Sequence, residues 1–207
     1  MINWKKAKEY WLHAYKSKQY INKPEKIQEA ENFVRKYASK IRWAKTICEL
    51  GISDGKHLHF FLEKYPNKEY YGNDFNPNVY SIVKKSYPDV FEKCNIMYKS
   101  TGKYLKGRLQ YVDAIFTYNH LMYVSDEEID KICSKISYVT GKYLLLREIY
   151  TSIKYDDLDE KSFLNFGSGR DYQDMFYEFE LKNKDIETIN INNKEVEFHT
   201  YLFKKMG

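Results

Sequence analysis

Residues 46–55 read Thr-Ile-Cys-Glu-Leu-Gly-Ile-Ser-Asp-Gly, and residues 70–75 read Tyr-Tyr-Gly-Asn-Asp-Phe. The first stretch is typical of a short apolar strand that runs into a tight turn of small residues. The second is typical of another strand, which ends on the acidic residue Asp74. A segment of helical length, residues 56–64, lies between them. This order of elements is how α/β proteins hold a nucleoside-containing cofactor, so the stretch predicts a cofactor class before any substrate.

The alternation of strand and helix continues along the chain. Two amphipathic helices are expected first, at 3–20 and 25–41. Apolar runs then predict strands at 45–50, 69–74, 94–98, 111–118 and 142–148, with helices at 55–64, 78–86 and 125–138. Ser125 and Glu128 fit a capping box at the start of the last helix, and Gly141 is expected to end it. Residues 186–191 and 195–203 alternate around a short polar turn, which predicts an antiparallel hairpin.

These elements predict an α/β fold with a doubly wound, Rossmann-like, mostly parallel sheet of seven strands and an antiparallel C-terminal hairpin. A chain of 207 residues suits one domain. Within it we expect residues 1–42 to form an N-terminal helical cap and residues 43–150 the cofactor-binding core. Residues 151–207 are expected to hold an acceptor loop and the hairpin, because 151–173 is loop-like.

Composition narrows the function classes. The net charge of +5 is mild and its lysines are scattered among acids, which argues against a nucleic-acid partner. The three cysteines form no C-x-x-C pair, so no metal site is predicted. The N-terminus lacks the apolar region of a signal peptide, and no apolar run approaches the ~20 residues that span a bilayer. We therefore expect a cytoplasmic protein without a membrane partner.

Several segments together resemble the class I S-adenosylmethionine-dependent methyltransferases. Residues 49–55, Glu-Leu-Gly-Ile-Ser-Asp-Gly, resemble that family's first motif, E/D-x-G-x-G-x-G, with Ser53 replacing the middle glycine. Residues 71–77, Tyr-Gly-Asn-Asp-Phe-Asn-Pro, resemble its second motif, G-x-D-x-S-P. Residues 113–124 are similar to its fourth strand and the loop that follows it. Residues 141–148 are similar to its fifth strand. The glycine spacing differs from the G-x-G-x-x-G of dehydrogenases, which disfavours a nicotinamide cofactor.

The resemblance implies the cofactor S-adenosyl-L-methionine and a set of residues that hold it. Gly51, Ser53 and Gly55 would let the backbone approach the methionine part, and Glu49 would order the turn or reach the ammonium through water. Asp74 would accept both ribose hydroxyls, and Phe75 would pack on adenine. Lys99 and Ser100 would lie near the adenine amine, where such families often carry an aspartate, and Asn119 would lie beside the methyl sulfonium. The corresponding structural alternatives are a helix cap for Asp74 and core packing for Phe75.

The acceptor side is less marked in the sequence. His120 directly follows the fourth strand and is the leading general base, with a packing role as the alternative. Glu148 ends the fifth strand and is a second candidate, with a salt bridge as the alternative. Asp171, in Arg170-Asp171-Tyr172, resembles a feature of small methyltransferases of glycan biosynthesis. These three residues are the predicted catalytic set.

The function that the resemblance implies is methyl transfer to a small polar acceptor, most simply to an oxygen of a sugar-like or other small metabolite. The Asn-Pro-Pro-Tyr motif of DNA adenine and protein glutamine methylation is absent after the fourth strand, and so is a Pro-Cys nucleophile for cytosine. An RNA methyltransferase remains an alternative because of the positive charge. A catalytically idle, cofactor-binding partner subunit is another, because of Ser53 and the missing acid near residue 99. The residues leave open the acceptor, the methylated atom and the oligomeric state.

Overall fold

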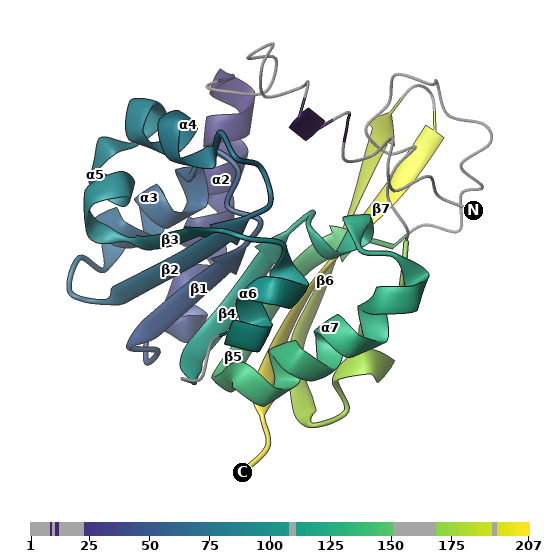
Figure 1. Ribbon diagram of the computed structural model, residues 1–207. Helices are drawn as coiled ribbons and strands as arrows, with labels where there is room; N and C mark the ends of the chain where they lie inside the picture. The colour runs from purple at the N-terminus through teal and green to yellow at the C-terminus, as the bar shows by residue number, and fades with distance from the viewer. Residues whose placement is uncertain (1–8, 10, 13–22, 108–110, 151–168, 192–193) are drawn as a thin grey trace.

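A computed structural model describes residues 9, 11–12, 23–107, 111–150, 169–191 and 194–207. Within them, seven strands form one sheet in the order β3-β2-β1-β4-β5-β7-β6 (Figure 1). Strands β1 to β5 pair in parallel, and β7 runs antiparallel to both β5 and β6. The predicted fold class, with its antiparallel hairpin, is therefore confirmed. The strands are β1 Thr46–Leu50, β2 Glu69–Asp74, β3 Asn95–Tyr98, β4 Val112–Tyr118, β5 Thr140–Ile149, β6 Phe179–Ile191 and β7 Lys194–Lys205.

Helices cover both faces of the sheet (Figure 1). Helices α2 to α5 lie on one face and α6 and α7 lie on the other. Their bounds are α2 Pro24–Tyr37, α3 Lys56–Lys64, α4 Val79–Ser86, α5 Pro88–Lys93, α6 Thr101–Gly107 and α7 Asp126–Val139. A 3-10 turn, Ala38–Ile41, extends α2, and two others span Leu121–Tyr123 and Asp174–Phe176. The helix predicted at 3–20 lies largely outside the described residues.

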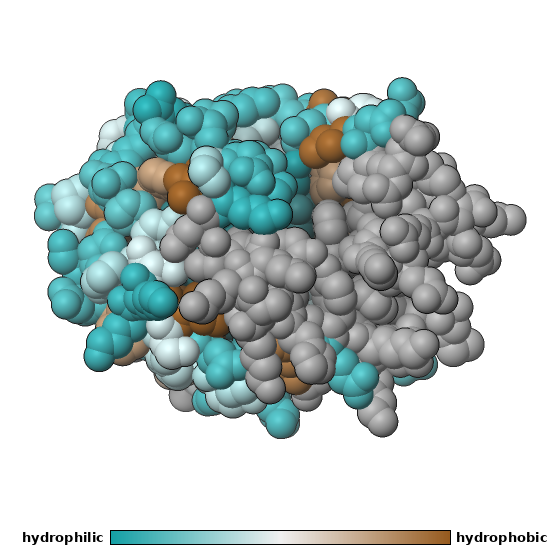
Figure 2. Space-filling view, turned by 90° about the horizontal axis from the view of Figure 1, so that it is seen from above, coloured by the Kyte–Doolittle hydropathy of each residue, from teal (hydrophilic) through white to brown (hydrophobic). Residues whose placement is uncertain are grey.

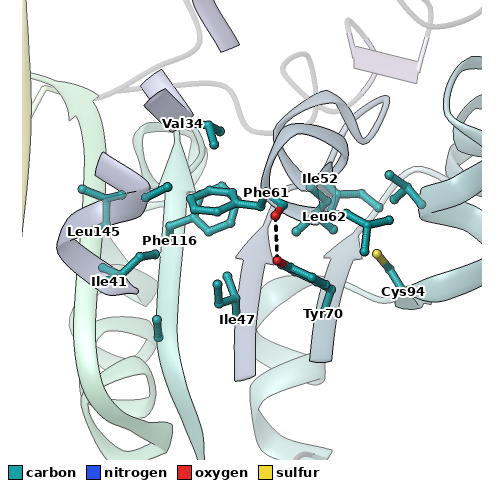
Figure 3. Packing of buried hydrophobic residues seen from close by; sticks show 14 of the residues in the cluster. Val34, Ile41, Ile47, Ile52, Phe61, Leu62, Tyr70, Cys94, Phe116 and Leu145 are labelled. Carbon is teal, nitrogen blue, oxygen red and sulfur yellow. Dashed lines mark hydrogen bonds between the residues drawn. The ribbon is translucent and has the colours of Figure 1, made fainter. Parts of the chain in front are cut away.

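Two large buried clusters form most of the core, one on each face, because successive side chains of a strand point to opposite sides. A third, smaller cluster holds Met122, Ile149, Val196 and Phe198. In β1, Ile47 belongs to the cluster under α2 to α5, whereas Cys48 and Leu50 belong to the cluster under α6 and α7. Phe116 and Ile115 of β4 divide in the same way. Figure 3 shows the first cluster around its labelled side chains, where the Tyr70 hydroxyl donates a hydrogen bond to the Phe61 carbonyl at 2.8 Å.

The structure corrects four local predictions. Helices α5 and α6 were not expected, and β6 begins at Phe179, seven residues before the predicted strand. Ser125 does precede α7, but its side chain makes no capping hydrogen bond, so the capping box does not form. Gly141 lies within β5, where a β-carbon would come within 3.3 Å of the Val112 carbonyl oxygen. This close approach between paired strands accounts for the glycine.

The strand order reverses direction between β1 and β4. From β1 the chain proceeds outward to β2 and β3, and from β4 it proceeds the other way to β5. Such a switch point opens a crevice beyond the carboxyl ends of the strands, where ligands of open α/β sheets bind. The turn after β1 and the loop after β4 meet there.

Candidate functional site

The turn after β1 combines three left-handed residues within five positions. Gly51, Ser53 and Gly55 have φ values of 79°, 56° and 89°. The backbone N–H groups of Gly51 and Ile52 both donate to the Asn73 carbonyl, at 2.9 and 3.0 Å, which ties the turn to the end of β2. Glycine adopts such values without strain, and Ser53 does so at a cost that is typical of functional turns.

The loop after β4 packs directly on this turn. A β-carbon on Gly51 would lie 2.3 Å from Nδ1 of His120. The imidazole of His120 therefore occupies the space that a side chain on residue 51 would need. Asn119 also has positive φ, at 54°, so the chain bends sharply where the two segments meet.

Asp74 lies at the end of β2 and is held by backbone donors. Its Oδ2 accepts from the Ser53 N–H at 3.0 Å, and its Oδ1 accepts from the Asn76 N–H at 2.9 Å. Burial raises the pKa of Asp74, and the backbone hydrogen bonds from Asn76, Ser53 and Phe75 counteract that rise. The helix-cap alternative is not what forms, because α4 begins at Val79 with Asn78 as its N-cap residue.

Glu49 and His57 form a buried pair behind the turn. Glu49 Oε1 lies 2.9 Å from His57 Nδ1, and the two residues are 1% and 7% exposed. Burial raises the pKa of Glu49 well above its usual range and lowers the pKa of His57 well below its own. The pair is therefore favoured in its uncharged form.

Unsatisfied polar atoms gather at this turn. Among the described residues, five buried side-chain atoms from 49–57 and 73–76 have no hydrogen-bond partner: Glu49 Oε2, Asp54 Oδ2, His57 Nε2, Asn73 Oδ1 and Asn76 Nδ2. Buried polar groups are nearly always paired in folded proteins. Here five unpaired atoms lie close to Gly51 and Gly55, which have no side chains to fill the space. This arrangement fits a site where a polar ligand or ordered water completes the hydrogen bonds.

Two neighbouring residues of β5 hold the loop after β4 from its two sides. Arg147 lies with its guanidinium 4.5 Å from the ring centre of Tyr118 and 4.4 Å from that of Phe198. It donates to Asn119 Oδ1 at 2.9 Å and to Glu187 Oε2 at 2.6 Å. Arg147 thus fixes the Asn119 side chain.

Glu148, on the opposite face of β5, holds the backbone of the same loop. Its Oε1 accepts from the Thr117 hydroxyl at 2.6 Å and from the His120 N–H at 3.1 Å, and its Oε2 accepts from the Met122 N–H at 3.1 Å. Burial raises the pKa of Glu148, and these hydrogen bonds counteract the rise. The residue is fully buried and does not line the cavity, so this geometry points to loop support rather than to contact with an acceptor.

His120 belongs to a short hydrogen-bonded chain. Asn73 Nδ2 lies 3.4 Å from Thr101 Oγ1, which lies 2.6 Å from His120 Nε2. If Asn73 donates to Thr101, the threonine hydroxyl is free to donate to Nε2, and Nδ1 then carries the imidazole proton. Burial lowers the pKa of His120 to about 4, so the ring is neutral at pH 7.

A cavity of about 700 Å³ opens at the switch point. Of the residues predicted from the sequence to form the site, those that line it are Gly51, Ser53, Asp74, Phe75, Ser100, Asn119 and His120. Gly55 instead precedes α3 in left-handed conformation, and Glu49 lies behind the turn. Lys99 contributes backbone, because its carbonyl accepts from Asn73 Nδ2 and its N–H donates to the Asp74 carbonyl.

Asp171 lies away from the cavity. Its Oδ1 accepts from the Tyr201 hydroxyl at 3.0 Å and from the Gln173 N–H at 3.0 Å, and Lys184 lies 3.7 Å from Oδ2. These contacts lower its pKa against the effect of partial burial. In this structure Asp171 links the segment that precedes β6 to Tyr201 of β7, and it does not line the cavity.

Several cavity residues were missed from the sequence. Thr101, Gly102, Lys103 and Lys106 belong to α6, which was not predicted, and Lys131 and Lys135 belong to a helix that was predicted but not connected to the site. His57 and Tyr118 also line the cavity, with ring centres 4.4 Å apart. The spacing of Lys131 and Lys135, one helical turn apart, was the available signal.

The residues that the structure describes contain no cluster of three or more His, Cys, Asp or Glu side chains arranged to hold a metal ion. None of their helices combines the length and apolar character needed to cross a membrane.

No family model matches the sequence. Solved structures do match. Magnesium protoporphyrin IX methyltransferase from Synechocystis PCC 6803, crystallised with S-adenosylmethionine, superposes with a TM-score of 0.63 at 10% identity, over 87% of this chain and 79% of that one. The methyltransferase domain of a bacterial Hen1 protein gives a TM-score of 0.63 at 14% identity, over 86% and 97%.

Mitomycin 7-O-methyltransferase gives a TM-score of 0.59 at 12% identity, over 86% of this chain and about half, 53%, of that one. Sequence identities this low show only that the folds are similar. The strand order, the antiparallel β7 and these superpositions agree on one conclusion: the chain has the fold of the class I S-adenosylmethionine-dependent methyltransferases.

Proposed function

We propose that this protein is an S-adenosylmethionine-dependent methyltransferase that transfers the methyl group to an oxygen of a small polar acceptor, such as a sugar derivative. The observation that carries the proposal is the convergence of the Gly51–Ser53 turn and Asp74 on one cavity at the switch point of the sheet. Magnesium protoporphyrin IX methyltransferase, crystallised with S-adenosylmethionine, and mitomycin 7-O-methyltransferase support it by analogy of fold.

The residues present fit this cofactor. Asp74 lines the cavity, and the backbone donors that hold it do not use all the lone pairs of a carboxylate, so it can still accept from a ribose hydroxyl. Gly51 leaves backbone accessible, and the unpaired Nε2 of the cavity residue His57 offers a polar partner behind the turn. Phe75 and Ser100 supply an aromatic ring and a polar group where the adenine would lie.

When bound, S-adenosylmethionine supplies an electrophilic methyl group on sulfur. What the chain itself adds is orientation and shielding from water, which can contribute much of the rate of an in-line displacement. Asn119, fixed by Arg147, and His120, fixed by Glu148, form the wall that orients the acceptor.

A hydroxyl acceptor must also lose a proton. Thr101 and His120 both line the cavity, so we assign them this step. The acceptor proton passes to Thr101 Oγ1 as the threonine proton passes to His120 Nε2. A pKa of about 4 makes His120 a weak base, so positioning carries more of the catalysis than proton removal.

Calorimetry with S-adenosylhomocysteine tests the proposal directly. Binding to the intact protein, at one site and weakened in Asp74→Asn, is the expected result. A protein that is folded by circular dichroism and takes up neither S-adenosylhomocysteine nor S-adenosylmethionine would overturn it. Glu127→Gln, an exposed change on α7, is the control for charge removal.

A further inference from the structure

One wall of the cavity is strongly basic. Helix α6 contributes Lys103 and Lys106, and helix α7 contributes Lys131 and Lys135. The two helices lie next to each other on the same face of the sheet (Figure 1). Residues three or four positions apart share a helix face, so each helix presents its two lysines on one side, toward the cavity. The part of the cavity that these four lysines line is named the groove.

These four lysines differ from the other cavity lysines in their partners. Lys26 is paired with Glu29 at 2.8 Å, and Lys56 is paired with Asp54 at 2.7 Å. By contrast, none of the four groove lysines forms an ion pair with a carboxylate of the described residues; Lys135 Nζ reaches only the Gly102 carbonyl, at 3.5 Å. Glu128 is the single acidic residue that α6 and α7 contribute to the lining.

Like charges that line one cavity repel each other, and a cleft lined by one sign of charge attracts the opposite ion. A carboxylate would offset one of four ammonium groups. A phosphomonoester carries about −1.5 to −2 at pH 7 with several strong acceptor oxygens, and lysine is a frequent phosphate ligand. The excess of lysine over acid thus favours phosphate over carboxylate. Seen from above, the described surface is mostly hydrophilic, with small hydrophobic groups between (Figure 2).

We propose that the groove, the part of the cavity lined by the lysines of α6 and α7, binds a phosphate or diphosphate group of the acceptor, so that the methyl acceptor is a phosphorylated small molecule. That the bound phosphate belongs to the methyl acceptor depends on the proposed methyl transfer. Binding of the anion itself can be tested without it. The acceptor's reacting oxygen then lies toward His120 and its phosphate toward α7.

The test uses two variants with equal loss of charge. In the groove variant, Lys103, Lys106, Lys131 and Lys135 are replaced by Gln. In the control variant the exposed lysines Lys40, Lys64, Lys85 and Lys93, none of which lines the cavity, are replaced by Gln. Lys and Gln have similar helix propensity, so both variants should fold, and circular dichroism checks that they do.

Each protein is titrated by calorimetry with inorganic pyrophosphate, acetate, a single-stranded RNA decamer and S-adenosylhomocysteine. We expect pyrophosphate to bind the wild type better than acetate does. The groove variant should lose roughly tenfold or more in pyrophosphate affinity, since several ion pairs are removed together. The control variant should stay within about twofold, because its lysines lie outside the site.

Equal pyrophosphate affinity in the groove and control variants would overturn the inference, as would no binding to the wild type. RNA binding with a steep salt dependence that the groove substitutions abolish, without pyrophosphate binding, would also overturn it in favour of an RNA acceptor. S-adenosylhomocysteine separates the two proposals. If it fails to bind while pyrophosphate binding depends on the groove lysines, methyl transfer falls and the anion site stands.

Discussion

The imidazole of His120 fills the space that a side chain on Gly51 would occupy. A β-carbon at residue 51 would lie 2.3 Å from Nδ1 and 2.6 Å from Cγ of His120. The turn after β1 and the loop after β4 are thus fitted to each other, and neither can change shape alone. This contact joins the segment expected to hold the cofactor to the segment expected to face the acceptor.

Gly51→Ala should therefore disturb both segments. The left-handed backbone costs alanine about 1–2 kcal/mol, and the clash with His120 adds about 1–3 kcal/mol. We expect a lower midpoint in urea unfolding and at least a tenfold loss of S-adenosylhomocysteine affinity. Gly107→Ala, whose β-carbon would meet nothing within 4 Å, is the matched control. In the double variant Gly51→Ala/His120→Ala only the β-carbon of residue 120 stays close, at 3.1 Å, so most of the clash is relieved. The double variant should therefore lose less stability than the sum of the two single variants; purely additive losses would contradict the contact.

Asp74→Asn should weaken cofactor binding. The substitution keeps the size of the side chain, but an amide NH2 would face the N–H of Ser53 or Asn76, and the charged acceptor would be lost. Hydrogen bonds to charged groups contribute about 1.5–3 kcal/mol, so S-adenosylhomocysteine affinity should fall roughly tenfold to a hundredfold. Unchanged affinity by calorimetry would remove Asp74 from the site. Asp130→Asn, an exposed change on α7, should leave affinity unaltered.

The contrast between Asp74 and Glu148 shows how far sequence patterns reach. Asp74 is predictable because it ends a strand next to a glycine turn, and strand ends at a switch point face the ligand. Glu148 also ends a strand, but its side chain meets three donors from β4 and its loop, and that satisfaction arises from tertiary contacts. Helix α6 escaped prediction because its seven residues are too few to show a clear 3.6-residue period. Lys103 and Lys106 of the groove were missed with it.

Glu148→Gln should destabilise the fold and not merely slow a reaction. Glutamine offers one oxygen and one NH2 group, so a donor such as the N–H of Met122 or His120 would be left without an acceptor. An unsatisfied buried donor costs about 1–3 kcal/mol, which should appear as a lower urea midpoint. A variant as stable as the wild type that nevertheless lost all methyl transfer would instead make Glu148 a catalytic residue.

Arg147→Lys should release Asn119. Lysine cannot stack between the rings of Tyr118 and Phe198 while bridging Asn119 and Glu187, because it lacks the planar fork of arginine. We expect a loss of about 2–3 kcal/mol in unfolding free energy, as for a charged hydrogen bond. Glu187→Gln, at a side chain that is 58% exposed, should cost less than about 1 kcal/mol. Equal losses in the two variants would show that Arg147 acts only through Glu187.

The pH dependence of stability should carry a contribution from His120. Burial lowers its pKa from 6.5 to about 4, so the unfolded chain binds a proton there more readily than the folded chain. The stability that comes from the neutral ring is therefore fully present above pH 6.5 and is lost as the pH falls toward 4. Urea unfolding from pH 7.5 to 4.5 should show the wild type losing more stability than His120→Gln, which has no such group.

His57 and His199, whose pKa values burial also lowers, contribute equally in both proteins, so the difference isolates His120. Parallel curves for the two proteins would mean that the ring of His120 titrates as it does in water and is not held against Gly51.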